Sequence, residues 1–218
     1  MQTLSLACWN YDRCEPLIDG RVAIDGIRLL PKVIYPSRIF AEAFTRASFD
    51  ICELSASSYL MQVAQGKCAY TAIPVFVSRA FRHNGFYVRA DSGIASPKDL
   101  EGRVIGVPEY QMTMALWARG ILQDDYGVDC RTFKTRTGGT NKAGRSERLP
   151  LVLPDHLDVR PIEDDENLND LMLAGALDAM ISPMTPQAFT AGDPRIRRLF
   201  ADPAAEERAY FARAGVFP

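Results

Sequence analysis

Short apolar runs alternate with amphipathic segments along the first part of the chain, which is the pattern of strands and helices in turn. Apolar runs bounded by turn residues predict strands, and apolar residues at helical spacing predict helices. Strands are expected at 3–8, 26–34, 49–54 and 71–77, with helices at 38–47 and 57–65. The succession of strand, helix and strand over 49–77 forms a βαβ unit, which implies a parallel sheet with a right-handed crossover.

A second, similar succession follows residue 95. It predicts a capped helical turn at 96–102, strands at 103–107, 133–137, 157–162 and 177–182, and helices at 111–128 and 167–175. The stretch 138–155 is rich in glycine, proline and charge, so we expect a surface excursion or a lid over a site. The whole pattern predicts two α/β lobes with mostly parallel sheets.

The lobe boundaries follow from this succession. We expect a first lobe at 1–85, a second lobe at 86–190, and a segment at 191–218 that returns towards the first lobe. Proteins of this kind bind ligands at the carboxyl ends of their strands, in the cleft between the lobes. A site in that cleft is therefore the expectation.

Composition narrows the class of partner. The 218 residues are 47% hydrophobic with a net charge of −2, which gives no reason to expect nucleic acid or an anionic membrane. No apolar run is long enough to span a bilayer, and the first residues lack the basic start of a secretory signal. Five cysteines without a CxxC pair favour a reducing cytoplasm over a disulfide framework or a zinc site. The sequence leaves a homo-oligomer open.

Two junctions between a strand and a helix carry polar side chains. The free amides and the dipole of a helix start attract anions, so these junctions are candidate ligand sites, although simple helix capping also explains them. The candidates are Ser55, Ser57 and Ser58 in the first lobe and Glu109, Tyr110, Gln111 and Thr113 in the second. The glycine pair Gly138 and Gly139 could present backbone amides to a ligand, or could simply form a turn.

The third candidate group follows the strand expected at 71–77. Arg79 and Arg82 offer fixed positive charges that grip carboxylates with paired hydrogen bonds, and His83 can hold or release a proton near neutral pH. A solvated loop is the alternative. The other histidine, His156, is expected to be structural or solvent-facing. Nucleotide-binding and hydrolase motifs are absent, no cofactor is expected, and two distant histidines disfavour a metal, although carboxylates alone could hold one.

Several blocks in order along the chain resemble the 4,5-dihydroxyphthalate decarboxylase family. They are LACWNYDRCEPLIDGRV, FDICELSASSYL, IPVFVSRAFRHNGFYVRADSGI, GVPEYQMTMALWARGILQDDYGV, LPL…LP and LDAMISP. The resemblance runs from about residue 3 to the end of the chain and implies the type II periplasmic-binding-protein fold. Family members continue further, with a strand that returns into the first lobe, so that lobe is expected to lack a strand here.

The resemblance implies a carboxy-lyase of phthalate degradation, which converts 4,5-dihydroxyphthalate to 3,4-dihydroxybenzoate and CO₂. On this reading Arg79 and Arg82 clamp a carboxylate, with Ser57 or Ser58 assisting, and His83 is the general acid. The phenolic proton would pass to Glu109 or Tyr110, and Asp12 with Arg13 would contact the catechol oxygens. The substrate-binding set also holds Gln111, Thr113, Gly138 and Gly139.

Two rival functions use the same fold. A solute-binding protein of the ABC-transporter type would close on an aromatic or dicarboxylate ligand without changing it, and a ligand-sensing domain could be built on the same lobes. The missing signal peptide and the SRAFRH block favour the enzyme.

Overall fold

The computed structural model describes residues 1–217, which divide into two compact units after Arg79. Met1–Arg79 is called the first unit here and Ala80–Pro218 the second. The sequence pattern placed this division after residue 85. Residues 191–218, expected as a separate returning segment, contribute a strand and a helix to the second unit.

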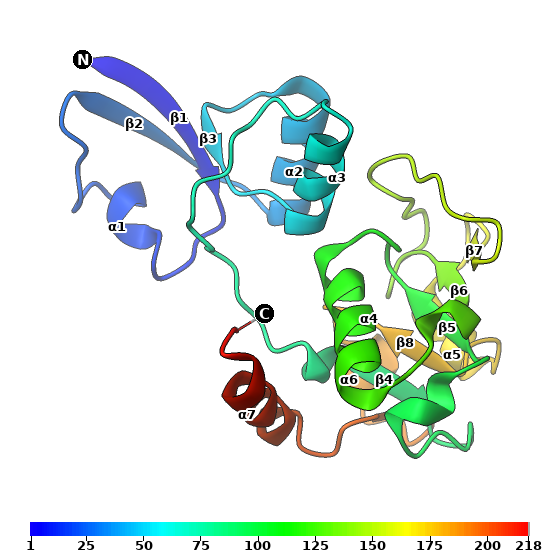
Figure 1. Cartoon of the computed structure of the whole chain (residues 1–218). Coiled ribbons are helices and arrows are strands. Elements are labelled where there is room, and N and C mark those ends of the chain that lie inside the picture. The colour runs from blue at the N-terminus through cyan, green and yellow to red at the C-terminus, as the bar shows by residue number, and fades with distance from the viewer. Residues whose placement is uncertain (218) are drawn as a thin grey trace. The chain divides into compact units, whose positions relative to one another are not determined.

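The first unit is a small parallel sheet with helices (Figure 1). Its strands lie in the order β2-β1-β3, and both neighbours of β1 run parallel to it. The elements are β1 (Gln2–Cys8), α1 (Glu15–Ile18), β2 (Ile27–Val33), α2 (Pro36–Arg46), β3 (Ile51–Cys52) and α3 (Ala56–Ala64). The apolar face of α2 packs Ile39 and Ala43 against Ala7 of β1. The crossover through α2 therefore carries the chain from β2 to β3 on the far side of β1.

The prediction of a strand at 71–77 was wrong. Residues 71–77 form no strand pairing and bend at Pro74, and the side chains of Ile73, Val75 and Phe76 are 65%, 61% and 67% exposed. A strand needs a neighbour that exchanges backbone hydrogen bonds with it, and an apolar run cannot supply one by itself. Pro74 also removes one of the donors that a ladder would use.

The second unit is built on a six-stranded sheet in the order β7-β6-β5-β8-β4-β9 (Figure 1). All neighbouring pairs are parallel except those made by β4, which runs antiparallel to β8 and to β9. The strands are β4 (Phe86–Arg89), β5 (Val104–Val107), β6 (Lys134–Thr137), β7 (Asp158–Pro161), β8 (Ala179–Ile181) and β9 (Ile196–Arg198). The helices are η1 (His83–Gly85), η2 (Pro97–Leu100), α4 (Thr113–Tyr126), η3 (Cys130–Thr132), α5 (Leu168–Leu173), α6 (Gln187–Thr190) and α7 (Pro203–Ala214).

Both faces of this sheet are buried. Side chains alternate along a strand, so Ala179 and Ile181 of β8 join the cluster that contains α4, while Met180 packs with α5 and α6. This explains why β5 and β8 are apolar runs rather than alternating sequences. The expected strands and helices between residues 96 and 182 are confirmed, within two or three residues at their ends.

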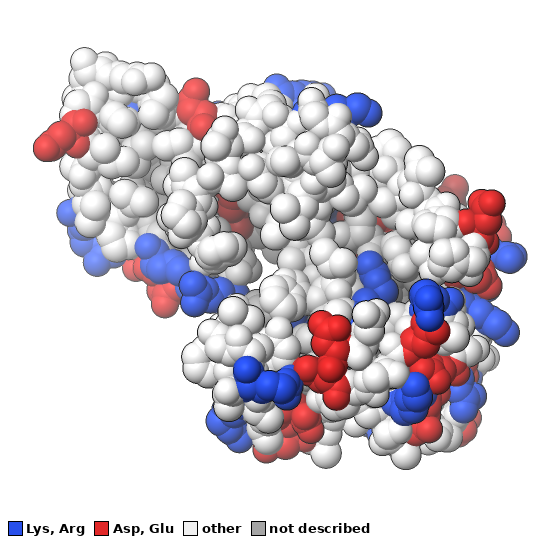
Figure 2. Space-filling view, viewed as in Figure 1, with Lys and Arg blue, Asp and Glu red and all other residues white. Residues whose placement is uncertain are grey.

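Charge is spread over the surface. Figure 2 shows acidic and basic side chains interspersed on the visible face, which fits the small net charge. Within residues 1–217, every helix is too short or too polar to cross a membrane.

Candidate functional site

The serines predicted as an anion site lie where β3 passes into α3. Ser57 and Ser58 are 4% and 0% exposed, and Ser55 stands at the N-cap position of α3 in extended conformation. The Ser55 hydroxyl lies 3.3 Å from the hydroxyls of both Ser57 and Ser58. The hydroxyls thus form one buried cluster at the carboxyl end of β3.

Glu53 stands beside this cluster and was missed by sequence reasoning. Its carboxyl group is buried and accepts hydrogen bonds from the backbone N–H of Trp9, at 2.6 Å, and from the Tyr11 hydroxyl, at 3.0 Å. Burial raises the pKa of Glu53 above its usual range, and burial together with the nearby Glu53 charge raises the pKa of Tyr11 to about 12. An acidic residue inside the apolar run expected as a strand at 49–54 is the signal that could have revealed it.

Asp12 and Arg13 lie at the surface of the same edge. Asp12 bonds the backbone and guanidinium of Arg13, while Arg13 Nε donates to the carbonyl of Val77. The Arg13 guanidinium lies 5.0 Å from the centre of the Tyr11 ring. Two of the predicted ligand contacts, Asp12 and Arg13, therefore frame Tyr11.

In the second unit, the predicted Glu109 is bound by two guanidinium groups. Glu109 is 2% exposed and its Oε1 accepts hydrogen bonds from Arg145 and Arg148. Glu109 is therefore the partner of two ion pairs. Both arginines come from the excursion at 138–155, which folds over the junction between β5 and α4.

The same excursion supplies the hydrogen-bond acceptor for the backbone amides before α4. The Glu147 carboxylate accepts from the backbone N–H of Tyr110, at 2.5 Å, and of Gln111, at 3.5 Å. Burial raises the pKa of Glu147. The Arg119 guanidinium lies 3.9 Å from the centre of the Tyr110 ring. An internal carboxylate thus occupies the position that the sequence assigned to a ligand, and Thr113 is the first residue of the helix behind it.

Gly138 and Gly139 have a structural role in this region. A Cβ on Gly138 would clash with the side chain of Ile162, and one on Gly139 with the carbonyl of Lys142. The Gly138 N–H donates to Val107. Close packing explains the glycine pair, and the amide of Gly138 is already used.

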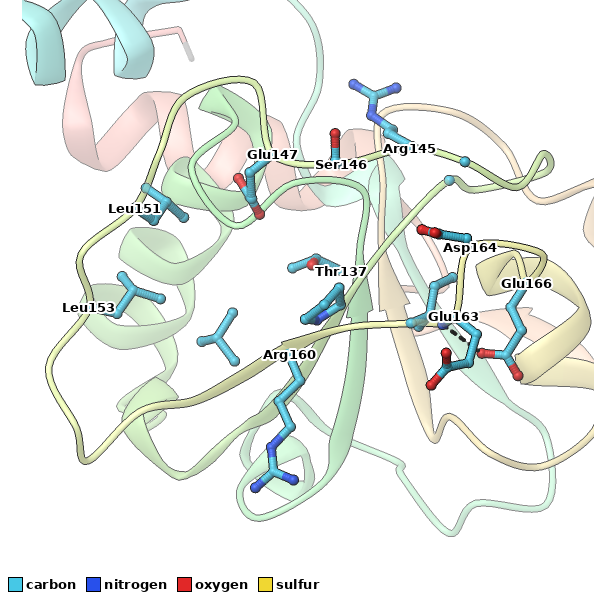
Figure 3. A pocket seen from close by; sticks show the side chains of 15 residues that line it. Thr137, Arg145, Ser146, Glu147, Leu151, Leu153, Arg160, Glu163, Asp164 and Glu166 are labelled. Carbon is cyan, nitrogen blue, oxygen red and sulfur yellow. Dashed lines mark hydrogen bonds between the residues drawn. The ribbon is translucent and has the colours of Figure 1, made fainter.

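A pocket of about 350 Å³ lies between this excursion and the ends of β6 and β7. Figure 3 shows Leu151 and Leu153 on one side of it and Glu163, Asp164 and Glu166 on the other. Carboxyl groups outnumber guanidinium groups in the lining, which disfavours a doubly anionic ligand.

The structure places His83, the predicted general acid, in the interior of the second unit. Its side chain is 1% exposed, Nδ1 lies 2.8 Å from Glu207 Oε1, and its backbone N–H donates to the same oxygen at 2.7 Å. The imidazole is surrounded by aromatic rings, the nearest being that of Phe200 at 4.9 Å between centres. Burial against α7 makes His83 part of the packing. His156 is exposed, as expected.

A second pocket, of about 200 Å³, lies next to His83 and is lined by arginine. Arg82 enters it from the residue before η1, and Arg198 enters from β9. In both residues Nε is buried without a hydrogen-bond partner among residues 1–217. Arg79, the other half of the predicted clamp, is exposed and closes the first unit, so the structure pairs Arg82 with Arg198 instead.

The predicted residues therefore gather in separate places. Asp12, Arg13, Ser57 and Ser58 share the carboxyl edge of the first sheet, and Glu109, Tyr110, Gln111 and Thr113 lie together before α4. Arg82 lies in the arginine pocket. Within residues 1–217, no three acidic, histidine or cysteine side chains are arranged to hold a metal ion.

Comparisons with known proteins add to this picture. The family described as NMT1/THI5 like matches residues 57–143. A protein of Comamonas testosteroni named 4,5-dihydroxyphthalate decarboxylase is 43% identical over 215 residues, which cover 99% of this chain and 65% of that relative. One of the same name from Pseudomonas putida is 44% identical over 200 residues, covering 92% of this chain and 78% of the relative.

Among solved structures, the periplasmic aliphatic sulphonate binding protein SsuA of Escherichia coli matches with a TM-score of 0.52 at 14% identity. The match covers 99% of this chain and 70% of that protein. At this identity the likeness concerns the fold alone, and it confirms the predicted periplasmic-binding-protein class.

Proposed function

Since the chain belongs to the 4,5-dihydroxyphthalate decarboxylase family, we propose that it catalyses the non-oxidative loss of one carboxylate from 4,5-dihydroxyphthalate. The products are 3,4-dihydroxybenzoate and CO₂. The observation that carries this proposal is the identity of 43–44% to two curated decarboxylases, over 92–99% of this chain. The chain spans 65% of the length of the Comamonas testosteroni relative. The activity of that relative is therefore a proposal for this chain.

The chemistry sets what a site must provide. Direct departure of CO₂ would leave an anion in the plane of the ring, which the π system cannot stabilise. Protonation of the carboxyl-bearing carbon avoids this, and the hydroxyl para to that carbon can supply the electrons. The site must therefore hold an anionic aromatic acid, favour the phenolate and deliver a proton to carbon.

Two kinds of group in the structure support these requirements. Arg82 and Arg198 give a pocket with positive charge for a carboxylate. Glu53 in the first unit and Glu147 in the second are carboxyls whose pKa burial raises, which favours the protonated form that a proton donor needs. The role of His83 as general acid stays a prediction; its ring is buried and lies 2.8 Å from Glu207.

The test is to incubate the purified full chain with 4,5-dihydroxyphthalate and to follow CO₂ release and product by chromatography. Phthalate is the matched control substrate: it carries both carboxylates but no hydroxyl, so it should bind without turnover. Glu53→Gln and Glu147→Gln then test each carboxyl as the proton donor, because only the variant that removes the donor should change the pH–rate profile. If 4,5-dihydroxyphthalate binds but is not turned over, like phthalate, the enzymatic function is refuted and a solute-binding protein is favoured. The cytoplasmic location stays a prediction.

A further inference from the structure

The arginine pocket contains an imbalance of charge that the ligand-free protein does not resolve. Arg82 and Arg198 both line it, and neither forms an ion pair with a carboxylate of residues 1–217. Each has a buried Nε without a hydrogen-bond partner. Burial lowers the pKa of Arg82, while the charge of Glu207 acts in the opposite direction. Both arginines are half-buried, and polar atoms removed from water are normally paired, so two guanidinium groups with a buried unpaired Nε in one pocket point to an anionic ligand.

The surroundings hold both guanidinium groups in place. The Arg198 guanidinium lies 5.2 Å from the centre of the Phe189 ring, and its residue is paired with Tyr87 across β4 and β9. Arg82 lies 3.9 Å from the sulfur of Met114 through Nη1 and directly precedes His83, which is fastened to α7. Contacts of this kind fix direction without satisfying charge. The arginines are therefore oriented before a ligand arrives.

Gly85 and Ser182 also line the pocket. A Cβ on Gly85 would come within 2.6 Å of the Ser182 carbonyl, so only glycine lets these two backbones meet. The Ser182 N–H donates to Gly85, and its hydroxyl lies 2.8 Å from that of Thr140. The Ser182 amide and hydroxyl are therefore already used within the protein. Arg82 and Arg198 are the charged side chains of the lining, so they are the groups that suit an anion.

We propose that Arg82 and Arg198 form a carboxylate subsite, and that it holds the carboxylate which the product keeps. This inference rests on the proposed decarboxylation. At about 200 Å³ the pocket is smaller than the ~300–1,000 Å³ of pockets that enclose a whole ligand, so it takes one end of the molecule. Guanidinium groups stabilise a carboxylate as an anion, which opposes its conversion to neutral CO₂. The carboxylate bound here is therefore retained, and the neighbouring one on the ring is lost.

The proposal explains where the reaction stops. The product 3,4-dihydroxybenzoate has a single carboxylate, which the two arginines of the subsite bind. The product therefore binds and is not decarboxylated again to catechol. Catechol itself has no anion for the arginines and should bind poorly.

The experiment measures ligand binding and thermal stability of the full chain with Arg82→Met and Arg198→Met. Phthalate, 3,4-dihydroxybenzoate and catechol are the probes, so binding is read without turnover. Each variant should bind phthalate and 3,4-dihydroxybenzoate about tenfold or more weakly, which is the effect of losing one charge-assisted hydrogen bond. The affinity for catechol should stay unchanged. The ligand-free variants should melt at the same temperature as the parent or higher, because a half-buried charge without an ion-pair partner has been removed.

Arg195→Met is the matched control. Arg195 lies three residues before Arg198 and is exposed in a pair with Asp193, so its loss should change neither binding nor melting. Arg198→Lys keeps the charge and serves where Arg198→Met fails to fold; it should keep part of the affinity. Unchanged carboxylate affinity in the Arg82 and Arg198 variants would overturn the subsite, even if the parent decarboxylates. If the Arg82 and Arg198 variants lose carboxylate affinity but the parent shows no turnover, the subsite stands and the proposed function is refuted.

Discussion

Replacing Glu207 with alanine tests the structural role of His83. The Glu207 carboxylate can only accept, so His83 donates to one oxygen, Oε1, from both its backbone N–H and Nδ1. Alanine leaves both donors unpaired in a site where the histidine side chain is 1% exposed. Each buried unpaired group costs about 1–3 kcal/mol.

The cost is partly offset, because Glu207 Oε2 is itself buried without a partner among residues 1–217. We therefore expect the free energy of unfolding to fall by about 2–4 kcal/mol, which lowers the melting temperature by roughly 5–15 °C for a chain of this size. Trp117 reports the transition, since its ring lies 6.5 Å from that of Tyr210 on α7. A Trp9→Phe background makes Trp117 the single tryptophan.

Arg208→Ala is the control for this measurement. Arg208 follows Glu207 on α7 and is exposed, so its loss should stay within about 0.5 kcal/mol of the parent. If Glu207→Ala unfolds at the same urea concentration as Arg208→Ala, the reasoning is refuted and the buried pair is not a structural anchor.

Three further predictions follow from single positions. Gly85→Ala should abolish phthalate binding and lower the melting temperature, because the added Cβ would lie 2.6 Å from the Ser182 carbonyl; calorimetry and a thermal melt check this. Glu147→Ala should lose about 1–3 kcal/mol in urea melts and Glu147→Gln less than that, because the amide oxygen of Gln keeps an acceptor for one of the two backbone donors and alanine keeps none. Glu53 binds its proton more tightly in the folded state, so the free energy of unfolding should fall as pH rises from 4.5 through the raised pKa of Glu53. In urea melts across this pH range, Glu53→Gln should flatten that fall. Asp50→Asn is the control and should not flatten it, because the pKa of Asp50 is lowered in the folded state.

Much of the fold could be predicted because the signals are local. The apolar runs that became β1, β5 and β8 and the helical spacing of α2 and α4 are visible within a short window of sequence. The stretch 71–77 has the same apolar character and forms no strand. Pairing decides that outcome, and pairing depends on residues far along the chain that the window does not contain.

The candidate site divides in the same way. Arg82 was predicted to bind a carboxylate from its residue type and neighbours, and the structure places it in an arginine pocket. Its companion Arg198 could not be predicted, because only the pairing of β9 with β4 brings it there. Glu53 was missed for a different reason. Its chemistry comes from burial and from the Tyr11 hydroxyl, and neither is written in the residues beside it.

His83 shows why residue type alone misleads about mechanism. Histidine next to two arginines suggests proton transfer, yet the ring is packed on Phe200 and bonded to Glu207. The turn that it anchors begins directly after Arg82, so His83 sets the position of a guanidinium that faces the pocket. A His83 variant that lost turnover would therefore not identify a proton donor. A displaced Arg82 would weaken carboxylate binding as well, whereas a missing acid would leave that affinity intact, so only the binding measurement separates the two explanations.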